Sequence, residues 1–163
     1  MQAYEGAPPI GYWGTTMPKN VVNLDALLKR EDFNVLSDKS KGSVRAGPGT
    51  NFNLSNLEAQ QVVFQILRKP DFQRETANWN PEAIAELVKN FLDGELIPAI
   101  IMWKSEKGNI FVIDGAHRLS ALIAWVHDDY GDNQLSTPFF GGDIPREQKK
   151  AAEETRALIK DTV

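Results

Sequence analysis

The sequence predicts an α+β protein in which helices surround a small sheet. Two apolar runs, residues 99–103 and 110–113, are joined by a short polar turn with Gly108, which is typical of a β-hairpin. Apolar side chains recur at helical spacing between residues 84 and 92, which predicts a helix before the hairpin. A second helical pattern begins at Ala116, directly after the second strand. Helices and a local hairpin together indicate the α+β class.

Composition limits the classes of function. The chain has 163 residues, 42% hydrophobic and 25% charged, which suggests one globular domain with an appended piece. The net charge of −4 excludes a surface that is basic throughout. The absence of cysteine excludes disulfides, thiolate metal sites and cysteine nucleophiles, and fits a cytoplasmic location. The chain has no membrane-length apolar run and no signal-peptide pattern at its N-terminus, so no membrane partner is expected.

The first third of the chain is predicted to be largely irregular. Residues 1–19, rich in glycine, proline and aromatics, are expected to pack back on the body or on another subunit, as in a homodimer. Residues 21–33 predict a short helix with Asn23 or Asp25 near its start. Residues 35–53 predict a long mobile loop, whose basic residues are solvated or contact phosphates: Lys39, Lys41 and Arg45.

The remaining elements follow from caps, breakers and periodicity. A helix is predicted from about residue 55 to Pro70, although residues 62–67 also fit a strand. Asn80 and Pro81 predict the cap and first residue of the next helix. Residues 135–140 predict a last strand, and residues 146–160 a charged helix that links to a further domain or docks elsewhere. This divides the chain into an arm and loop (1–53), a core (54–143) and a C-terminal helix (144–163).

The corner between residues 113 and 116 is the strongest candidate for a site. The first amides of a helix have no intrahelical acceptor, and Gly115 would let a ligand approach the backbone closely. Arg118 adds a guanidinium fork, so the corner predicts a phosphate or other anion site. The alternative is a plain strand–turn–helix in which Asp114 caps the helix and His117 and Arg118 are solvated.

The order of motifs resembles the ParB/sulfiredoxin superfamily. Residues 72–74 read Phe-Gln-Arg, then come a helix, a strand after Pro98, a second strand, and Asp-Gly-Ala-His-Arg. Within the superfamily the chain is most similar to the DGQHR and DGQQR branches, which include DndB-type proteins and GmrSD N-terminal domains. The resemblance covers residues 69–126 and implies a small mixed sheet with surrounding helices. The motif differs at Ala116, where the branch usually has glutamine, and the missing cysteine excludes the sulfiredoxin reaction.

The resemblance also implies roles for single residues. Residues 115–121 fit the Gly-x-x-Arg-x-x-Ala element of CTP-binding ParB proteins, which implies phosphate contacts from Gly115 and Arg118. The upstream pair of that family falls on Gln73 and Arg74, which implies a place beside the same pocket. From the residues alone, Arg74 is equally explained by an ion pair with Asp71 or Glu75.

The leading expectation is a DNA-associated domain that binds a nucleoside triphosphate with Mg²⁺. Hydrolysis of that triphosphate is a further expectation. Gln73, Arg74, Gly115, Ala116 and Arg118 would bind the nucleotide. Asp114 would act in catalysis and hold the nucleotide-bound metal, and His117 would orient a water or accept its proton. The alternative is a non-catalytic DNA-binding regulatory module linked to DNA modification or phage defence. Whether the protein is an enzyme stays open at this point.

Overall fold

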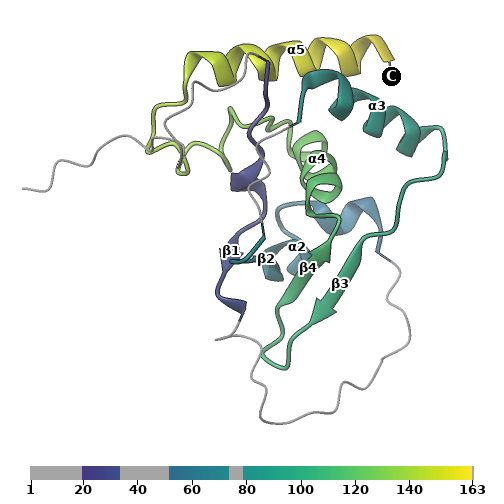
Figure 1. Ribbon diagram of the computed structural model, residues 1–163, viewed down its shortest axis with the longest axis vertical. Coiled ribbons are helices and arrows are strands. Elements are labelled where there is room, and N and C mark those ends of the chain that lie inside the picture. Colours follow the sequence, from purple (N-terminus) through teal and green to yellow (C-terminus); the bar gives the residue numbers. More distant parts are fainter. Residues whose placement is uncertain (1–19, 34–51, 74–78, 163) are drawn as a thin grey trace, which may run out of the picture.

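A four-stranded mixed sheet lies at one end of the molecule in the computed structural model, which describes residues 20–33, 52–73 and 79–162 (Figure 1). The strand order is β1-β2-β4-β3, with β1 parallel to β2 and β2 parallel to β4. The α+β class and the mixed sheet are confirmed. The strands are β1 (Arg30–Glu31), β2 (Leu67–Pro70), β3 (Ile101–Lys104) and β4 (Ile110–Asp114).

Strands β3 and β4 form the predicted hairpin. They pair antiparallel, and Trp103 lies opposite Phe111. The connecting turn is fixed by Ser105, whose amide donates to the Asn109 carbonyl at 2.8 Å and whose Oγ accepts from the Asn109 amide at 3.1 Å. The turn therefore brings the two apolar runs into register through local contacts.

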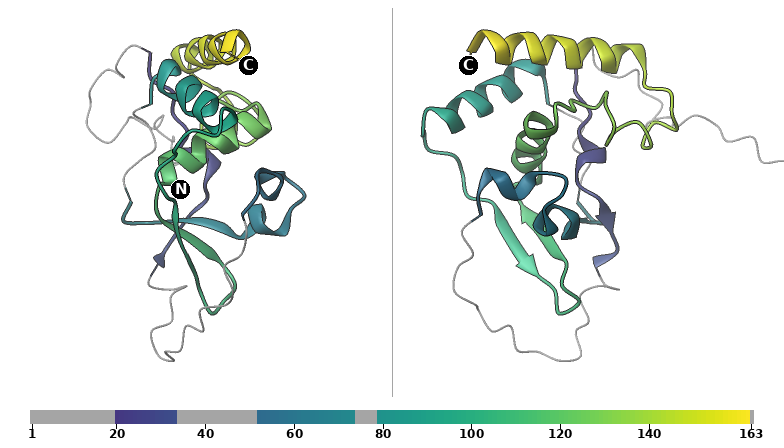
Figure 2. Two further views of the ribbon diagram at one scale, coloured as in Figure 1. Left: turned by 90° about the vertical axis from the view of Figure 1, so that its right-hand side faces the viewer. Right: turned by 180° about the vertical axis from the view of Figure 1, so that it is seen from behind.

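Three longer helices form the other end of the molecule. Helix α4 (Ala116–His127) lies between the sheet and the pair formed by α3 (Pro81–Leu92) and α5 (Arg146–Thr162) (Figures 1 and 2). Asn80 caps α3 by accepting from the Ala83 amide at 2.8 Å, as the sequence predicts.

The core lies around α4, where every side chain from Leu119 to Ala124 is buried. The predicted C-terminal helix is confirmed, and its apolar face belongs to this core, since Ala151, Ala152 and Ile159 are buried. Helix α5 packs against α3.

The helix predicted over residues 21–33 is largely wrong. Up to Asp32 only one turn of 3₁₀ helix forms, η1 (Asp25–Leu27), although Asn23 does precede it and its Oδ1 accepts from the Asp25 amide at 2.9 Å. The chain then extends into β1, because its backbone pairs with β2: the Lys69 amide donates to the Lys29 carbonyl at 2.9 Å. A two-residue strand has no sequence periodicity, so pairing with a distant segment decides its structure.

The helix predicted from about residue 55 to Pro70 is also only partly correct. The segment divides into a 3₁₀ turn, η2 (Leu54–Leu57), a short helix, α2 (Val62–Ile66), and β2. The alternative strand over residues 62–67 is wrong except at Leu67. Strand β2 lies between β1 and β4, so its burial on both sides overrides the helical spacing.

The strand predicted over residues 135–140 is wrong, and Asp129 is the reason. Its carboxylate is buried and the following chain coils around it in a series of turns. Such a buried carboxylate is stable only when donors surround it, so the loop folds to supply them. Oδ1 accepts from the amides of Gly131, Asp132 and Asn133 and from Ser136 Oγ, and Oδ2 accepts from the amides of Leu135 and Ser136.

Candidate functional site

The corner between β4 and α4 has the predicted geometry of strand, glycine turn and helix. Gly115 adopts φ 86° and ψ 15°, in the left-handed region that favours glycine. A Cβ at this position would lie 3.0 Å from Arg118 Nη2 and from Ile100 Cγ1. The position therefore requires glycine both for its backbone conformation and for lack of space.

Helix α4 begins without a side-chain cap. Gly115 occupies the N-cap position, and no side chain accepts a hydrogen bond from the first-turn amides there. The interpretation of Asp114 as a helix cap is therefore wrong. Asp114 instead ends β4, and its Oδ2 accepts from Arg118 Nη2 at 3.1 Å.

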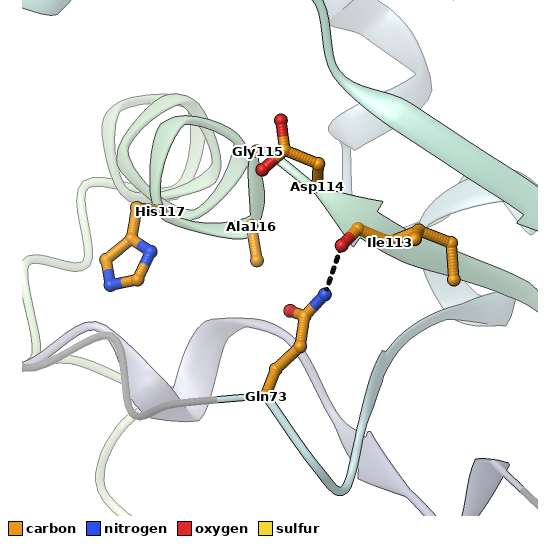
Figure 3. A pocket seen from close by; sticks show the side chains of 6 residues that line it. All are labelled: Gln73, Ile113, Asp114, Gly115, Ala116 and His117. Atoms are coloured by element: carbon orange, nitrogen blue, oxygen red, sulfur yellow. Dashed lines mark hydrogen bonds between the residues drawn. The ribbon is translucent and has the colours of Figure 1, made fainter.

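A pocket of about 220 Å³ lies at this helix start (Figure 3). Three segments meet there: the turn after β2, the end of β4 and the first turn of α4. Five of the residues predicted for the site thus come together around one space. The lining consists of Gln73, Ile113, Asp114, Gly115, Ala116 and His117.

Gln73 fastens one wall of the pocket to the end of β4. Its Nε2 donates to the carbonyls of Val112 and Ile113, both at 2.7 Å. In Figure 3 the amide nitrogen faces Ile113, and the amide oxygen points toward Ala116. The side chain thus leaves an acceptor on the pocket side while its donor holds the strand.

Arg118 does not line the pocket. Its Nη2 donates to the Ala99 carbonyl at 2.9 Å and to Asp114, and the guanidinium lies against Gly115. Its Nε is buried and has no hydrogen-bond partner within the part of the chain that the structure describes. Arg118 is therefore placed to balance the charge of Asp114, while Arg74 lies outside the described residues.

The donor set fits a metal ion only together with a ligand's own oxygens. Across the three described ranges, no group of three or more histidine, cysteine, aspartate or glutamate side chains could hold a metal ion. Asp114 is the one carboxylate among the described lining residues, and its side chain is 64% exposed. This arrangement suits Mg²⁺, which commonly binds through one or two carboxylates plus phosphate oxygens.

A comparison with protein families decides what kind of domain this is. A family model described as the N-terminal domain of the GmrSD restriction endonuclease matches residues 53–162, well over half of the chain. The chain belongs to this family. No curated protein and no solved structure matches it. The resemblance to the GmrSD N-terminal branch is thus confirmed, and the observed sheet and helices are consistent with the ParB/sulfiredoxin-like fold.

The GmrSD match includes the whole pocket and both elements that build the corner, β4 and α4. It also extends through α5, so the packed helical layer is part of the matched domain. In the described ranges, no helix is both long enough and apolar enough to cross a membrane.

Two residues at or beside this site are not predicted from the sequence: Ile113, which lines the pocket, and Arg30. Arg30, in β1, donates from Nη1 to the Gln73 carbonyl at 2.6 Å and to the Asp71 carbonyl at 2.9 Å. Arg30 lies before the first residue of the GmrSD match. Because 43 residues separate Arg30 from Gln73, no local pattern links them. Lys69 in β2 is also buried, but it stands between Arg68 and Pro70, so no pattern in the sequence indicates a buried charge there.

Proposed function

We propose that this GmrSD-type N-terminal domain binds the phosphates of a nucleoside triphosphate in the pocket at the start of α4. The observation that carries the proposal is a twelve-residue helix whose uncapped first turn opens on a pocket. Unpaired first-turn amides and the positive end of the helix dipole favour an anion at that point.

The size of the pocket favours phosphate groups over a whole nucleotide. Sites that enclose a drug-sized ligand usually measure roughly 300–1,000 Å³, whereas this one measures about 220 Å³. The triphosphate would therefore enter the pocket, and the base and ribose would remain outside it.

Charge explains why Mg²⁺ belongs to the proposal. The Asp114 carboxylate lines the pocket and by itself repels an anion. A magnesium ion held jointly by Asp114 and the phosphates would supply charge neutralisation. Arg118, paired with Asp114 at 3.1 Å, would offset the same carboxylate from the other side.

Hydrolysis is the catalytic extension of this proposal, with His117 as the base. His117 lines the pocket one turn or less from the first amides of α4. A water oxygen would attack the terminal phosphorus, the phosphoanhydride P–O bond would break, and the water proton would pass to the imidazole. The β-phosphate oxygen would keep the electron pair of the broken bond.

The restriction family supports association with DNA as the second part of the proposal, since a restriction endonuclease acts on DNA. The competing function is a non-catalytic regulatory module that binds DNA without a nucleotide. The absence of a metal-binding carboxylate group in the described residues favours that module over a domain that cleaves DNA directly.

The test is thermal unfolding with each of four ribonucleoside triphosphates and with inorganic triphosphate, with and without Mg²⁺. A ligand that binds only the folded state raises its stability, by about 2.7 kcal/mol at a hundred times its Kd. We expect stabilisation by inorganic triphosphate with Mg²⁺, because the phosphates carry the interaction. Stabilisation by duplex DNA, with none by any triphosphate, would establish the regulatory module instead.

Asp114→Asn is the most informative variant, because its effect on triphosphate affinity should be opposite with and without Mg²⁺. With Mg²⁺ the substitution should weaken triphosphate binding, since an amide is a poorer magnesium ligand. Without Mg²⁺ it should strengthen binding, since a negative charge is removed from the pocket. Asp143→Asn, at an exposed carboxylate outside the pocket, is the matched control and should change neither value.

A further inference from the structure

One side chain from outside the matched GmrSD domain holds the turn that carries Gln73. Arg30 Nη1 donates to two carbonyls of this turn, Asp71 at 2.9 Å and Gln73 at 2.6 Å. Among the described residues, the turn also has backbone bonds from the Gln73 amide to the Pro70 carbonyl at 3.1 Å and from the Asp71 amide to the Glu31 carbonyl at 3.0 Å. The guanidinium therefore closes the turn immediately after β2, at the wall of the pocket.

Arg30 is itself held in place by Asp25. Its Nη2 lies 3.3 Å from both carboxylate oxygens of Asp25, and Asp25 also pairs with Lys69. The Lys69 side chain is fully buried and that of Asp25 is 8% exposed, whereas that of Arg30 is 33% exposed. A buried ammonium requires a charged partner, so Asp25 cannot leave this position without a large penalty. The orientation of the Arg30 fork is thereby fixed.

The contacts form a chain that ends in the pocket. Arg30 holds the backbone of Gln73, and the Gln73 side chain holds the Val112 and Ile113 carbonyls at the end of β4. Arginine suits this position, because a planar fork of five donors can bind a carboxylate and two carbonyls together. A lysine has the charge but cannot span these acceptors in one plane.

We propose that Arg30 is a positioning residue for the pocket. It fixes the Gln73 amide against β4, so the segment before the matched domain completes the site. The effect on ligand affinity rests on the proposed triphosphate function, whereas the effect on the Gln73 amide does not.

The first experiment is therefore independent of any ligand. Nuclear magnetic resonance of the Gln73 side-chain amide, assigned by its loss in Gln73→Met, should show slow hydrogen exchange in the natural chain. In Arg30→Met and Arg30→Lys, exchange should approach that of a free glutamine side chain. An amide signal that is unchanged in both variants overturns the proposal, whatever the protein binds.

Two variants serve as controls for loss of folding. Arg30→Lys keeps a cation beside Asp25, so it decides the outcome if Arg30→Met unfolds. Arg156→Met is the matched control, because Arg156 has a similar side-chain exposure of 30% and also pairs with carboxylates, Asp128 and Asp132. Arg156 contacts Asp128 at the C-terminal end of α4, away from the pocket. Its replacement should therefore lower stability and leave the Gln73 amide unchanged.

The second experiment measures affinity for inorganic triphosphate with Mg²⁺ in a double-mutant cycle. Arg30→Met and Gln73→Met should each weaken binding by roughly tenfold, since each removes hydrogen bonds that hold the Gln73 side chain against β4. The double variant should be no weaker than either single one, because Arg30 acts through Gln73. If the double variant instead lost affinity by the product of the two single effects, the positioning role of Arg30 would be overturned. If the natural chain does not bind triphosphate at all, the proposed function fails and the amide experiment still tests Arg30.

Discussion

Arg118 and Asp114 are joined across Gly115 by a hydrogen bond of 3.1 Å between Nη2 and Oδ2. The pair lies beside the pocket, but only Asp114 lines it. Exposed ion pairs of this kind contribute about 0–1 kcal/mol to stability, so the pair is more important for the charge at the helix start than for the fold.

Arg118→Ala should therefore weaken triphosphate binding by roughly tenfold, because Asp114 is left without its partner cation. Binding without Mg²⁺ should recover in the double variant Asp114→Asn/Arg118→Ala, since the unbalanced carboxylate is then gone. Isothermal calorimetry of the single and double variants measures both effects. A double variant that stays as weak as Arg118→Ala would mean that the guanidinium contacts the phosphates directly.

Gly115→Ala should destabilise the protein more than Gly108→Ala, although both glycines have a similar positive φ, 86° and 89°. A Cβ at Gly108 meets nothing within 4 Å, so only backbone strain of about 1–2 kcal/mol is expected. At Gly115 the Cβ also crowds Ile100, whose Cα lies 3.2 Å away, which should raise the loss to about 3 kcal/mol. Urea unfolding measures the difference, and equal losses would show that the corner relaxes without cost.

Asp129→Asn should be among the most destabilising conservative substitutions in the chain. The single amide oxygen of asparagine cannot accept all the donors that surround this buried carboxylate, and its NH₂ group would face backbone N–H groups. We expect a loss of about 3 kcal/mol in the free energy of unfolding. Asp143→Asn, at an exposed position, should stay within about 0.5 kcal/mol. A loss at Asp129 no larger than this control would mean that the loop does not depend on the carboxylate.

Tyr130 should make the protein less stable at alkaline pH. Burial raises the pKa of its hydroxyl above the ordinary value, and the nearby Asp128 carboxylate adds to the effect. The raised pKa means that the folded state keeps its proton where the unfolded state, with a pKa of about 10, has lost it. This contribution to stability is complete below pH 10 and decreases as the pH rises toward the folded-state pKa, by up to about 1.4 kcal/mol per pH unit.

Tyr130→Phe should flatten this alkaline decrease, because the ionising group is removed from both states. Chemical unfolding at several pH values between 9 and 11.5 measures the difference between the two proteins. Parallel pH profiles for the natural chain and the variant would contradict the account.

The elements that the sequence predicts well are those with local causes. Helix α3 is predictable because Asn80 and Pro81 start it and its apolar residues keep one face. The hairpin and the corner at Gly115 depend on a turn and on a change of period within a few residues. The pocket follows from the corner, which is why Asp114, Gly115, Ala116 and His117 meet where the sequence suggests.

The elements that the sequence does not predict are decided by distant partners. The helical spacing before β2 runs as far as Leu67, but the chain extends from there because β1 lies on one side of it and β4 on the other. The turns after α4 are organised by one buried carboxylate, that of Asp129, which no periodicity reveals. Arg118 has the residue type of a phosphate ligand, yet its direction depends on the Ala99 carbonyl, 19 residues away.

Because β2 and β4 are parallel, the residues that fill the interior of the sheet and the residues that line the pocket are different ones. Leu67 in β2 and Phe111 and Val112 in β4 are buried, whereas the turn after β2 and the end of β4 line the pocket. Substitutions after Pro70 or Asp114 therefore change the lining of the pocket, while the interior of the sheet stays as it is.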